Sequence, residues 1–365
     1  MDESPQPRTG RMEQIIAGIR ARYGRLMPFI VVGYIALFAL TFFVLNLRMS
    51  VEWVSIALLG AALLTGKFKI FIRDWGVFIA AVIAWQVTDG LALKFNFPWH
   101  VRDMYDVDAW IFQPVLHGKI PTVWLQQHMF HNGRLGWFDI VAVVVYSLHF
   151  LLPLGAGFVL WLVNRDLFHS YAVCFIIAAV LGFATYIVYP AVPPWMAAQF
   201  ASHCVGNVNC YHLPGNPHPV SPWVWNVWAH TMQKWLTTSQ GNVGFGQLTL
   251  GYDQVGAMPS EHVMYPTLVF LFFRRQFGRI GYLMVPYILL VTFAIVYMGQ
   301  HYFIDAVVGV IYASVVYATV MIAIPKAVAY FRAHPLANPF APQPRLARGS
   351  MGEEVMAMES AERAS

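Results

Sequence analysis

Long apolar runs separated by short polar connections make up most of the chain. A helix needs about 20 mainly apolar residues to cross a bilayer, and most of these runs approach or exceed that length. The pattern predicts an all-α, polytopic membrane protein with about eight transmembrane helices. The expected spans are Pro28 to Leu47, Val51 to Gly66, Phe71 to Ala92, Phe138 to Val163, His169 to Tyr189, His262 to Phe273, Ile280 to Met298 and Asp305 to Ile324.

The composition supports lipid as the solvent of this chain. Hydrophobic residues make up 58% of it and charged residues only 11%, whereas soluble domains carry about a quarter charged residues. Five arginines precede the first span without the short apolar region of a cleaved signal peptide. We therefore expect an integral membrane protein that retains this N-terminal segment and has no nucleic-acid partner.

The distribution of basic residues predicts the orientation, because Lys and Arg are retained on the cytoplasmic side. With both termini inside, 17 of the 23 Lys and Arg residues fall in cytoplasmic segments. The expected organisation is a cytoplasmic segment 1–27, three transmembrane helices in 28–92, an extracytoplasmic interfacial segment 93–137, a catalytic membrane core 138–326 with an extracytoplasmic loop 190–261, and a disordered cytoplasmic tail 327–365. The short chain without sorting tails favours a bacterial plasma membrane over a Golgi membrane.

Two motifs at span ends carry groups suited to phosphoester chemistry. Pro259-Ser260-Glu261-His262 leads into the sixth span, and we expect Pro259 in the first helical turn. The exposed N–H groups of such a turn form an anion site, with Ser260 and His262 as further donors. If the eighth span begins by His301, that residue shares a face with Asp305, whose carboxylate can fix the imidazole tautomer.

These motifs resemble the second and third signatures of the type 2 phosphatidic acid phosphatase superfamily. The segment Tyr189-Pro190-Ala191-Val192-Pro193-Pro194 and residues 105–162 are most similar to its inositol phosphorylceramide synthase branch. The resemblance implies a six-helix phosphatase-like core, His301 as the nucleophile, Asp305 as its orienting partner, and His262 as general acid and base. It also implies Ser260 beside the phosphate and no metal or other cofactor.

The chain lacks the Lys-x6-Arg-Pro signature of the phosphatases, and Ala294 and Ile295 stand where their Ser-Arg pair is expected. A site with fewer cations suits a phosphodiester better than a doubly charged phosphomonoester. We therefore predict transfer of a phospho-headgroup from a phospholipid donor to a lipid or alcohol acceptor. The alternatives are a lipid phosphate phosphatase and, in another class, a non-catalytic lipid-binding protein or transporter.

Other polar residues have a structural and a functional interpretation. His149, one turn from Tyr146, is expected either to pack with one hydrogen bond or to bind substrate with Tyr146. Asp103, Asp106 and Asp108 are interpreted as a hydrated acidic turn in preference to a cation site. Cys204 and Cys210 lie in the expected outer loop, and the sequence allows either a disulfide between them or two free thiols. The headgroup, acceptor and oligomeric state do not follow from the sequence.

Overall fold

The computed structural model describes residues 58–60, 68–87, 95, 97–131, 134, 136–199, 224–231 and 256–333. The expected first span, most of the second, the two loop cysteines and most of the tail lie outside the described residues. The chain divides into two compact units, Met1–Val320 and Met321–Ser365. In the second unit the described residues form the end of a π-helical turn, Thr319–Ala323, and helix α14, Ile324–Ala333.

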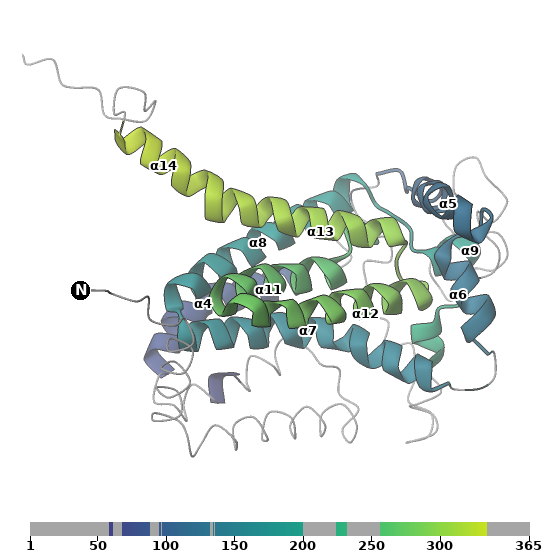
Figure 1. Cartoon of the computed structure of the whole chain (residues 1–365), viewed down its shortest axis with the longest axis horizontal. Coiled ribbons are helices and arrows are strands. Elements are labelled where there is room, and N and C mark those ends of the chain that lie inside the picture. The colour runs from purple at the N-terminus through teal and green to yellow at the C-terminus, as the bar shows by residue number, and fades with distance from the viewer. Residues whose placement is uncertain are drawn as a thin grey trace, which may run out of the picture. The chain divides into compact units, whose positions relative to one another are not determined.

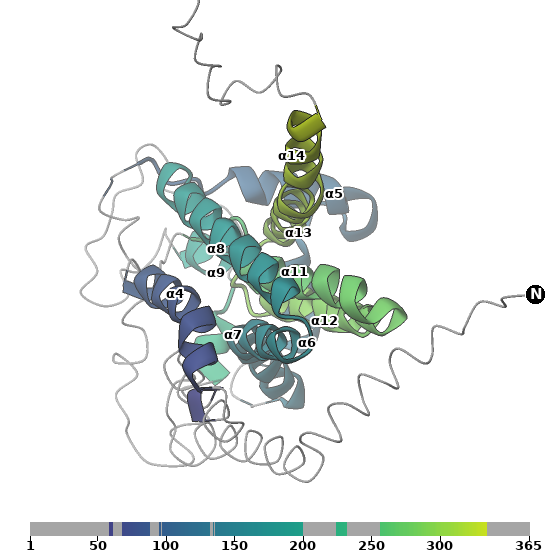
Figure 2. The same ribbon diagram turned by 90° about the vertical axis from the view of Figure 1, so that its left-hand side faces the viewer.

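Every longer regular element among the described residues of the first unit is a helix (Figures 1 and 2). These helices are α4 (Phe68–Val87), α5 (Asp103–Leu116), α6 (Pro121–Met129), α7 (Trp137–Val163), α8 (Arg165–Val188), α9 (Pro194–Gln199), α11 (Glu261–Phe277), the 3-10 helix η4 (Gly278–Leu283), α12 (Met284–Tyr297) and α13 (Phe303–Ala318). The all-α prediction is confirmed for this part of the chain.

Three described helical stretches are long and apolar enough to cross a membrane: Arg165–Val188, Glu261–Tyr297 and Phe303–Tyr330. A fourth is added if the bent pair Trp137–His149 and Leu151–Val163 is one span. This supports an integral membrane protein and leaves the predicted number of eight spans as a prediction. The 37-residue stretch Glu261–Tyr297 is a hairpin, since η4 separates α11 from α12 and the two helices pack against each other.

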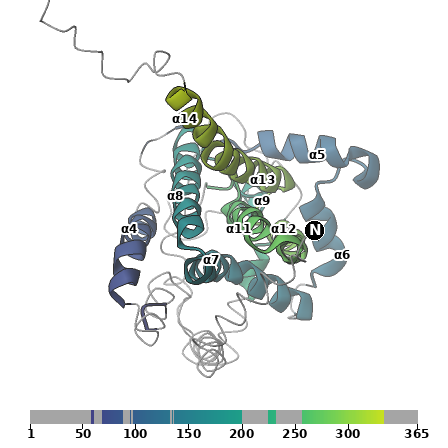
Figure 3. The same ribbon diagram turned by 60° about the vertical axis from the view of Figure 1, so that its left-hand side comes forward.

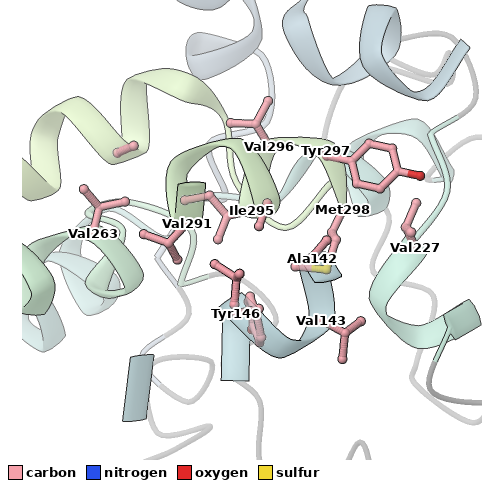
Figure 4. Packing of buried hydrophobic residues seen from close by; sticks show 13 residues of the cluster. Ala142, Val143, Tyr146, Val227, Val263, Val291, Ile295, Val296, Tyr297 and Met298 are labelled. Carbon is pink, nitrogen blue, oxygen red and sulfur yellow. The ribbon is translucent and has the colours of Figure 1, made fainter. Parts of the chain in front are cut away.

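Helix α11 lies at the centre of the bundle and packs against α7, α8, α12 and α13 (Figure 3). Apolar side chains cover most of its circumference, as expected for a helix that is surrounded by others. Figure 4 shows part of the core, where Tyr146 of α7, Val263 of α11 and Ile295 of α12 pack together. Val263 directly follows His262, so this part of the core adjoins the first histidine motif.

Helices α5 and α6 fall in the segment 93–137, for which short helices were predicted. They pack against each other; α5 also contacts α13, and α6 contacts α12. Figure 1 shows both at the end of the bundle where α12 passes into α13. A short set of backbone hydrogen bonds ties the chain together at this end: Val192 N donates to His100 O over 2.9 Å, and Ala257 N donates to Ala191 O over 3.1 Å.

Candidate active site

The two motif histidines meet in the structure. His262 is the second residue of α11 and His301 follows α12. The hairpin brings Nε2 of His301 to 3.2 Å from Nδ1 of His262. The His301 side chain is buried. Two residues 39 positions apart therefore form one pair of imidazoles.

The tautomer of His301 follows from its second ring nitrogen. Nδ1 of His301 lies 2.7 Å from the carbonyl oxygen of Ala257. A carbonyl oxygen can only accept, so Nδ1 carries the hydrogen and the neutral ring has its lone pair on Nε2. Ala257 is itself held by Ala191, which gives the Tyr189–Pro194 motif a role in placing this carbonyl.

Asp305 lies beside His301, although the condition from which this was expected, a helix that begins by His301, is not met. Helix α13 begins at Phe303, so His301 precedes the helix instead of sharing its first turn. Oδ2 of Asp305 accepts a hydrogen bond from Tyr302 N over 2.8 Å and lies 3.6 Å from Nδ1 of His301. The carboxylate thus caps its own helix and acts on the imidazole through its charge, while the direct hydrogen bond goes to Ala257.

Ser260 and Pro259 also lie differently from the expectation. Helix α11 begins at Glu261 with Ser260 as its N-cap, so Pro259 precedes the helix and the prediction that it lies in the first turn is wrong. The prediction for Pro259 failed because Ser260, a favoured N-cap residue, occupies the N-cap position and leaves Pro259 outside the helix. Ser260 N donates to Asp305 O over 3.0 Å, which joins the two motifs through the backbone.

Helix α7 contributes two rings to the site. The ring of Tyr146 stacks on that of His262 with centroids 4.2 Å apart, and the ring of His149 lies 3.8 Å from it. Nδ1 of His149 lies 2.6 Å from the carbonyl oxygen of Tyr146. The helix bends by 45° between His149 and Leu151, where Pro153 cannot donate to the carbonyl of His149. The structure thus places His149 beside His262, with one hydrogen-bond contact inside its own helix.

Several buried polar atoms around the histidines have no hydrogen-bond partner within the described part of the chain. They are Ser260 Oγ, His262 Nε2, Tyr302 OH and Asp305 Oδ1. Leaving such groups unpaired costs free energy of folding. A cluster of them therefore indicates a binding or catalytic site. The described residues contain no group of three or more His, Cys, Asp or Glu side chains that could hold a metal ion.

The acidic segment 103–108 is not a uniformly hydrated turn. Asp103 and Asp106 are exposed and lie beside His100 and Arg102, respectively. Asp108 is fully buried, and its two oxygens accept from the backbone N–H groups of Phe303 and Ile304 at 2.8 and 3.0 Å. Burial raises the pKa of Asp108 to about 7 against the lowering effect of these two donors, and the charge of Asp305 adds to the increase. The prediction of a hydrated turn is wrong for this residue.

Sequence reasoning missed Asp108 and the Ala257 carbonyl for different reasons. Asp108 follows Met104 by one helical turn, and both are buried in α5. A carboxylate on the apolar stripe of a helix was therefore the available signal. The Ala257 carbonyl belongs to the backbone, so the residue type at this position gives no indication of its role.

A sequence model of the PAP2 superfamily matches residues 119–319, which is more than half of the chain. The chain belongs to the PAP2 superfamily. This membership supports a phosphatase- or phosphotransferase-type activity at the membrane and makes an enzyme the expected kind of protein. No curated protein and no solved structure gave a match. The PAP2 match includes His262, His301 and Asp305 but begins after α5, so Asp108 lies outside it.

Proposed function

We propose that this PAP2 superfamily protein transfers a phospho-headgroup from a phospholipid donor to a lipid or alcohol acceptor through a phosphohistidine intermediate. The observation that carries the proposal is the 3.2 Å approach of His301 Nε2 to His262 Nδ1. One nitrogen with a lone pair and one with a transferable proton then face the same point. Double displacement at phosphorus needs this pair.

The first half-reaction begins when the phosphoester replaces His262 as the neighbour of His301 Nε2. The lone pair of Nε2 attacks phosphorus and forms a P–N bond while the bond from phosphorus to the donor alcohol oxygen breaks. Protonated His262 gives its proton to that oxygen, and the donor leaves as an alcohol. The hydrogen bond from Nδ1 to Ala257 and the nearby Asp305 carboxylate stabilise the positive charge that develops on His301.

The second half-reaction reverses these roles. Neutral His262 takes the proton from the hydroxyl group of the acceptor, whose oxygen attacks phosphorus and displaces His301. The P–N bond breaks and its electron pair returns to Nε2. We assign Ser260 to the phosphoryl oxygens, because its hydroxyl is buried without a partner among the described residues and its backbone is bonded to that of Asp305. Tyr146 and His149 hold the ring of His262 and line the substrate side.

The charge balance supports a diester substrate. Among the described residues, the ion pairs of arginine are with Asp74 and Asp106, and none of the ion pairs brings Lys or Arg to the histidine site. A phosphodiester carries one negative charge, whereas a phosphomonoester carries up to two and needs more cationic groups. The similarity to the inositol phosphorylceramide synthase branch points to the same class of substrate, and we place the reaction at the non-cytoplasmic face of a bacterial plasma membrane.

The test is an assay of purified protein in detergent with a phosphatidylinositol donor labelled in the phosphate. We expect a labelled new lipid only when an acceptor such as ceramide or diacylglycerol is present, and an acid-labile, base-stable phosphoenzyme when it is absent. His301→Asn should lower transfer by at least about 1,000-fold, as loss of a nucleophile does. His128→Asn, at an exposed position of α6, is the matched control and should retain activity.

The outcomes separate the candidate functions. Release of inorganic phosphate from phosphatidic acid without an acceptor would make the protein a phosphatase. Activity that survives His301→Asn would remove the phosphohistidine mechanism. Donor and acceptor lipids that bind without turnover would indicate a non-catalytic lipid-binding protein.

A further inference from the structure

The nucleophile of the proposed reaction lies in a short non-helical connection. We call residues 298–302, between the end of α12 and the start of α13, the catalytic turn. His301 is its fourth residue. Because Nε2 must point at phosphorus to attack, whatever fixes the two ends of this turn sets the direction of attack.

Gln126 of α6 holds the first end. Its Nε2 donates to Tyr297 O over 2.8 Å and to Trp225 O over 2.9 Å, while its Oε1 accepts from Trp225 N over 2.8 Å. The side chain is buried and its three polar hydrogen-bonding contacts are all to backbone. One amide therefore ties the last residue of α12 to the segment that contains Trp225.

The catalytic turn is pressed against that same segment. Gly299 has a φ of +74°, and a Cβ added to it would lie 2.9 Å from Trp225 O. Only glycine fits both the left-handed conformation and this approach. The position of the turn at this end thus depends on the backbone that Gln126 holds.

Asp108 of α5 holds the other end. Its carboxylate accepts from the first two N–H groups of α13, Phe303 and Ile304, which follow His301 by two and three residues. These groups have no carbonyl partner within the helix, and they carry the positive end of its dipole. A buried side chain that accepts both of these hydrogen bonds fixes where α13 begins.

We infer that Asp108 and Gln126 are positioning residues that fix the two ends of the catalytic turn and so aim Nε2 of His301 at phosphorus. The inference rests on the proposed function. Within the described part of the chain, the hydrogen bonds of both side chains go to backbone groups and not to the imidazoles, so each acts through the backbone on one side of His301. Their helices contact the bundle at the helices that flank this turn, α12 and α13, which makes the outer segment part of the active-site framework.

The chain provides matched controls for both residues. Asp106 lies on α5 two positions from Asp108 but is exposed and pairs with Arg102. Gln127 follows Gln126 on α6, is exposed, and accepts from Lys119. Asp108→Asn replaces one acceptor oxygen with a donor that faces an N–H group, and Gln126→Met removes the hydrogen bonds at similar volume. Asp106→Asn and Gln127→Met make the same changes where no catalytic backbone is held.

The measurements are kcat, KM and the single-turnover rate of phosphoenzyme formation, each expressed per folded protein from thermal unfolding in detergent. We expect Asp108→Asn and Gln126→Met each to lower kcat and phosphoenzyme formation by about 10- to 100-fold, because a small misplacement of a reacting group has costs of this size. KM should stay within about twofold, since the substrate contacts remain. Asp106→Asn and Gln127→Met should match the wild type.

Variants that are folded and form phosphoenzyme at the wild-type rate would overturn the positioning role. A rise in KM with an unchanged kcat would overturn it as well, since that pattern belongs to substrate binding. If Asp108→Asn does not fold, Gln126→Met decides the question at the other end of the turn. Wild-type protein that forms no phosphoenzyme would instead overturn the proposed function itself.

Discussion

At the scale of single residues, His262 is surrounded by ring faces. The stacked ring of Tyr146 is inclined by 29° to that of His262, and His149 lies on another side of it. These contacts hold the ring so that Nδ1 faces His301. The face of a tyrosine ring also attracts a cation, so the stack offsets part of the cost of burying the protonated form that the first half-reaction needs.

Tyr146→Phe keeps the ring face and should retain transfer activity within about threefold. Tyr146→Ala removes the face and should lower kcat by about tenfold, the equivalent of one modest cation–π contact and the lost orientation of the ring. The measurement is steady-state transfer by both variants, with Val141→Ala at an exposed position of α7 as the control. Equal losses in the Phe and Ala variants would show that the hydroxyl group matters instead of the ring.

The residues that meet at the candidate site were largely predictable at this scale, while the groups that support them were not. His262, His301, Asp305 and Ser260 stand in two short motifs whose residue types already suit phosphoryl transfer, and the structure gathers them. Asp108 was misinterpreted because its partners, the N–H groups of Phe303 and Ile304, lie 195 and 196 positions away in the sequence. A local pattern contains no information on such a contact.

At the scale of elements, the sequence located the helices better than their ends. The sixth expected span stops at Phe273, but α11 continues to Phe277 because Arg274 and Arg275 end an apolar run without ending a helix. Basic residues suit the last helical turn, where they face the negative end of the dipole. The fifth expected span begins at His169, whereas Asn164 caps α8 and starts it at Arg165 by accepting from Leu167 N.

The crossing of α11 and α13 gives a prediction about packing. A Cβ added to Gly309 of α13 would lie 2.5 Å from Ser260 O, so Gly309→Ala should force the two helices apart at the junction of the motifs. We expect a loss of about 1–3 kcal/mol in stability, typical of overpacking, together with reduced transfer activity.

Thermal unfolding in detergent and the transfer assay test this expectation. The control is Gly155→Ala on α7, because a Cβ there meets nothing within 4 Å and alanine favours a helix. It should unfold at or above the wild-type temperature. If Gly309→Ala unfolds at the same temperature as this control, the close approach of the helices does not limit packing.

At the scale of the whole molecule, the distribution of charge predicts which face carries the site. The 17-to-6 distribution of Lys and Arg places Arg279, at the turn between α11 and α12, inside and Arg134 outside. The α11–α12 hairpin brings His301 back to the end of the bundle where α11 begins. If Arg279 at the turn of this hairpin is cytoplasmic, both histidines lie toward the opposite face of the membrane, where we place the proposed reaction.

Single cysteines at Arg134 and at Arg279 test this orientation in intact cells. Cys204 and Cys210 are first replaced by serine, and Cys174 is buried, so it should not react. We expect a membrane-impermeant maleimide to label Arg134→Cys but not Arg279→Cys until the cells are opened. The reverse pattern would move the proposed reaction to the cytoplasmic face.

The hairpin of α11 and α12 has a consequence for how the family can vary. His262 lies in the first turn of α11 and His301 lies just after the end of α12. The two histidines can meet only if α11 and α12 have matched lengths. Each inserted residue advances a helix by about 1.5 Å and rotates the remainder of that helix by about 100°, which would carry one imidazole out of reach of the other. Insertions and deletions in functional members of the family should therefore be confined to η4, at the other end of the hairpin, where an added residue changes the length of neither α11 nor α12.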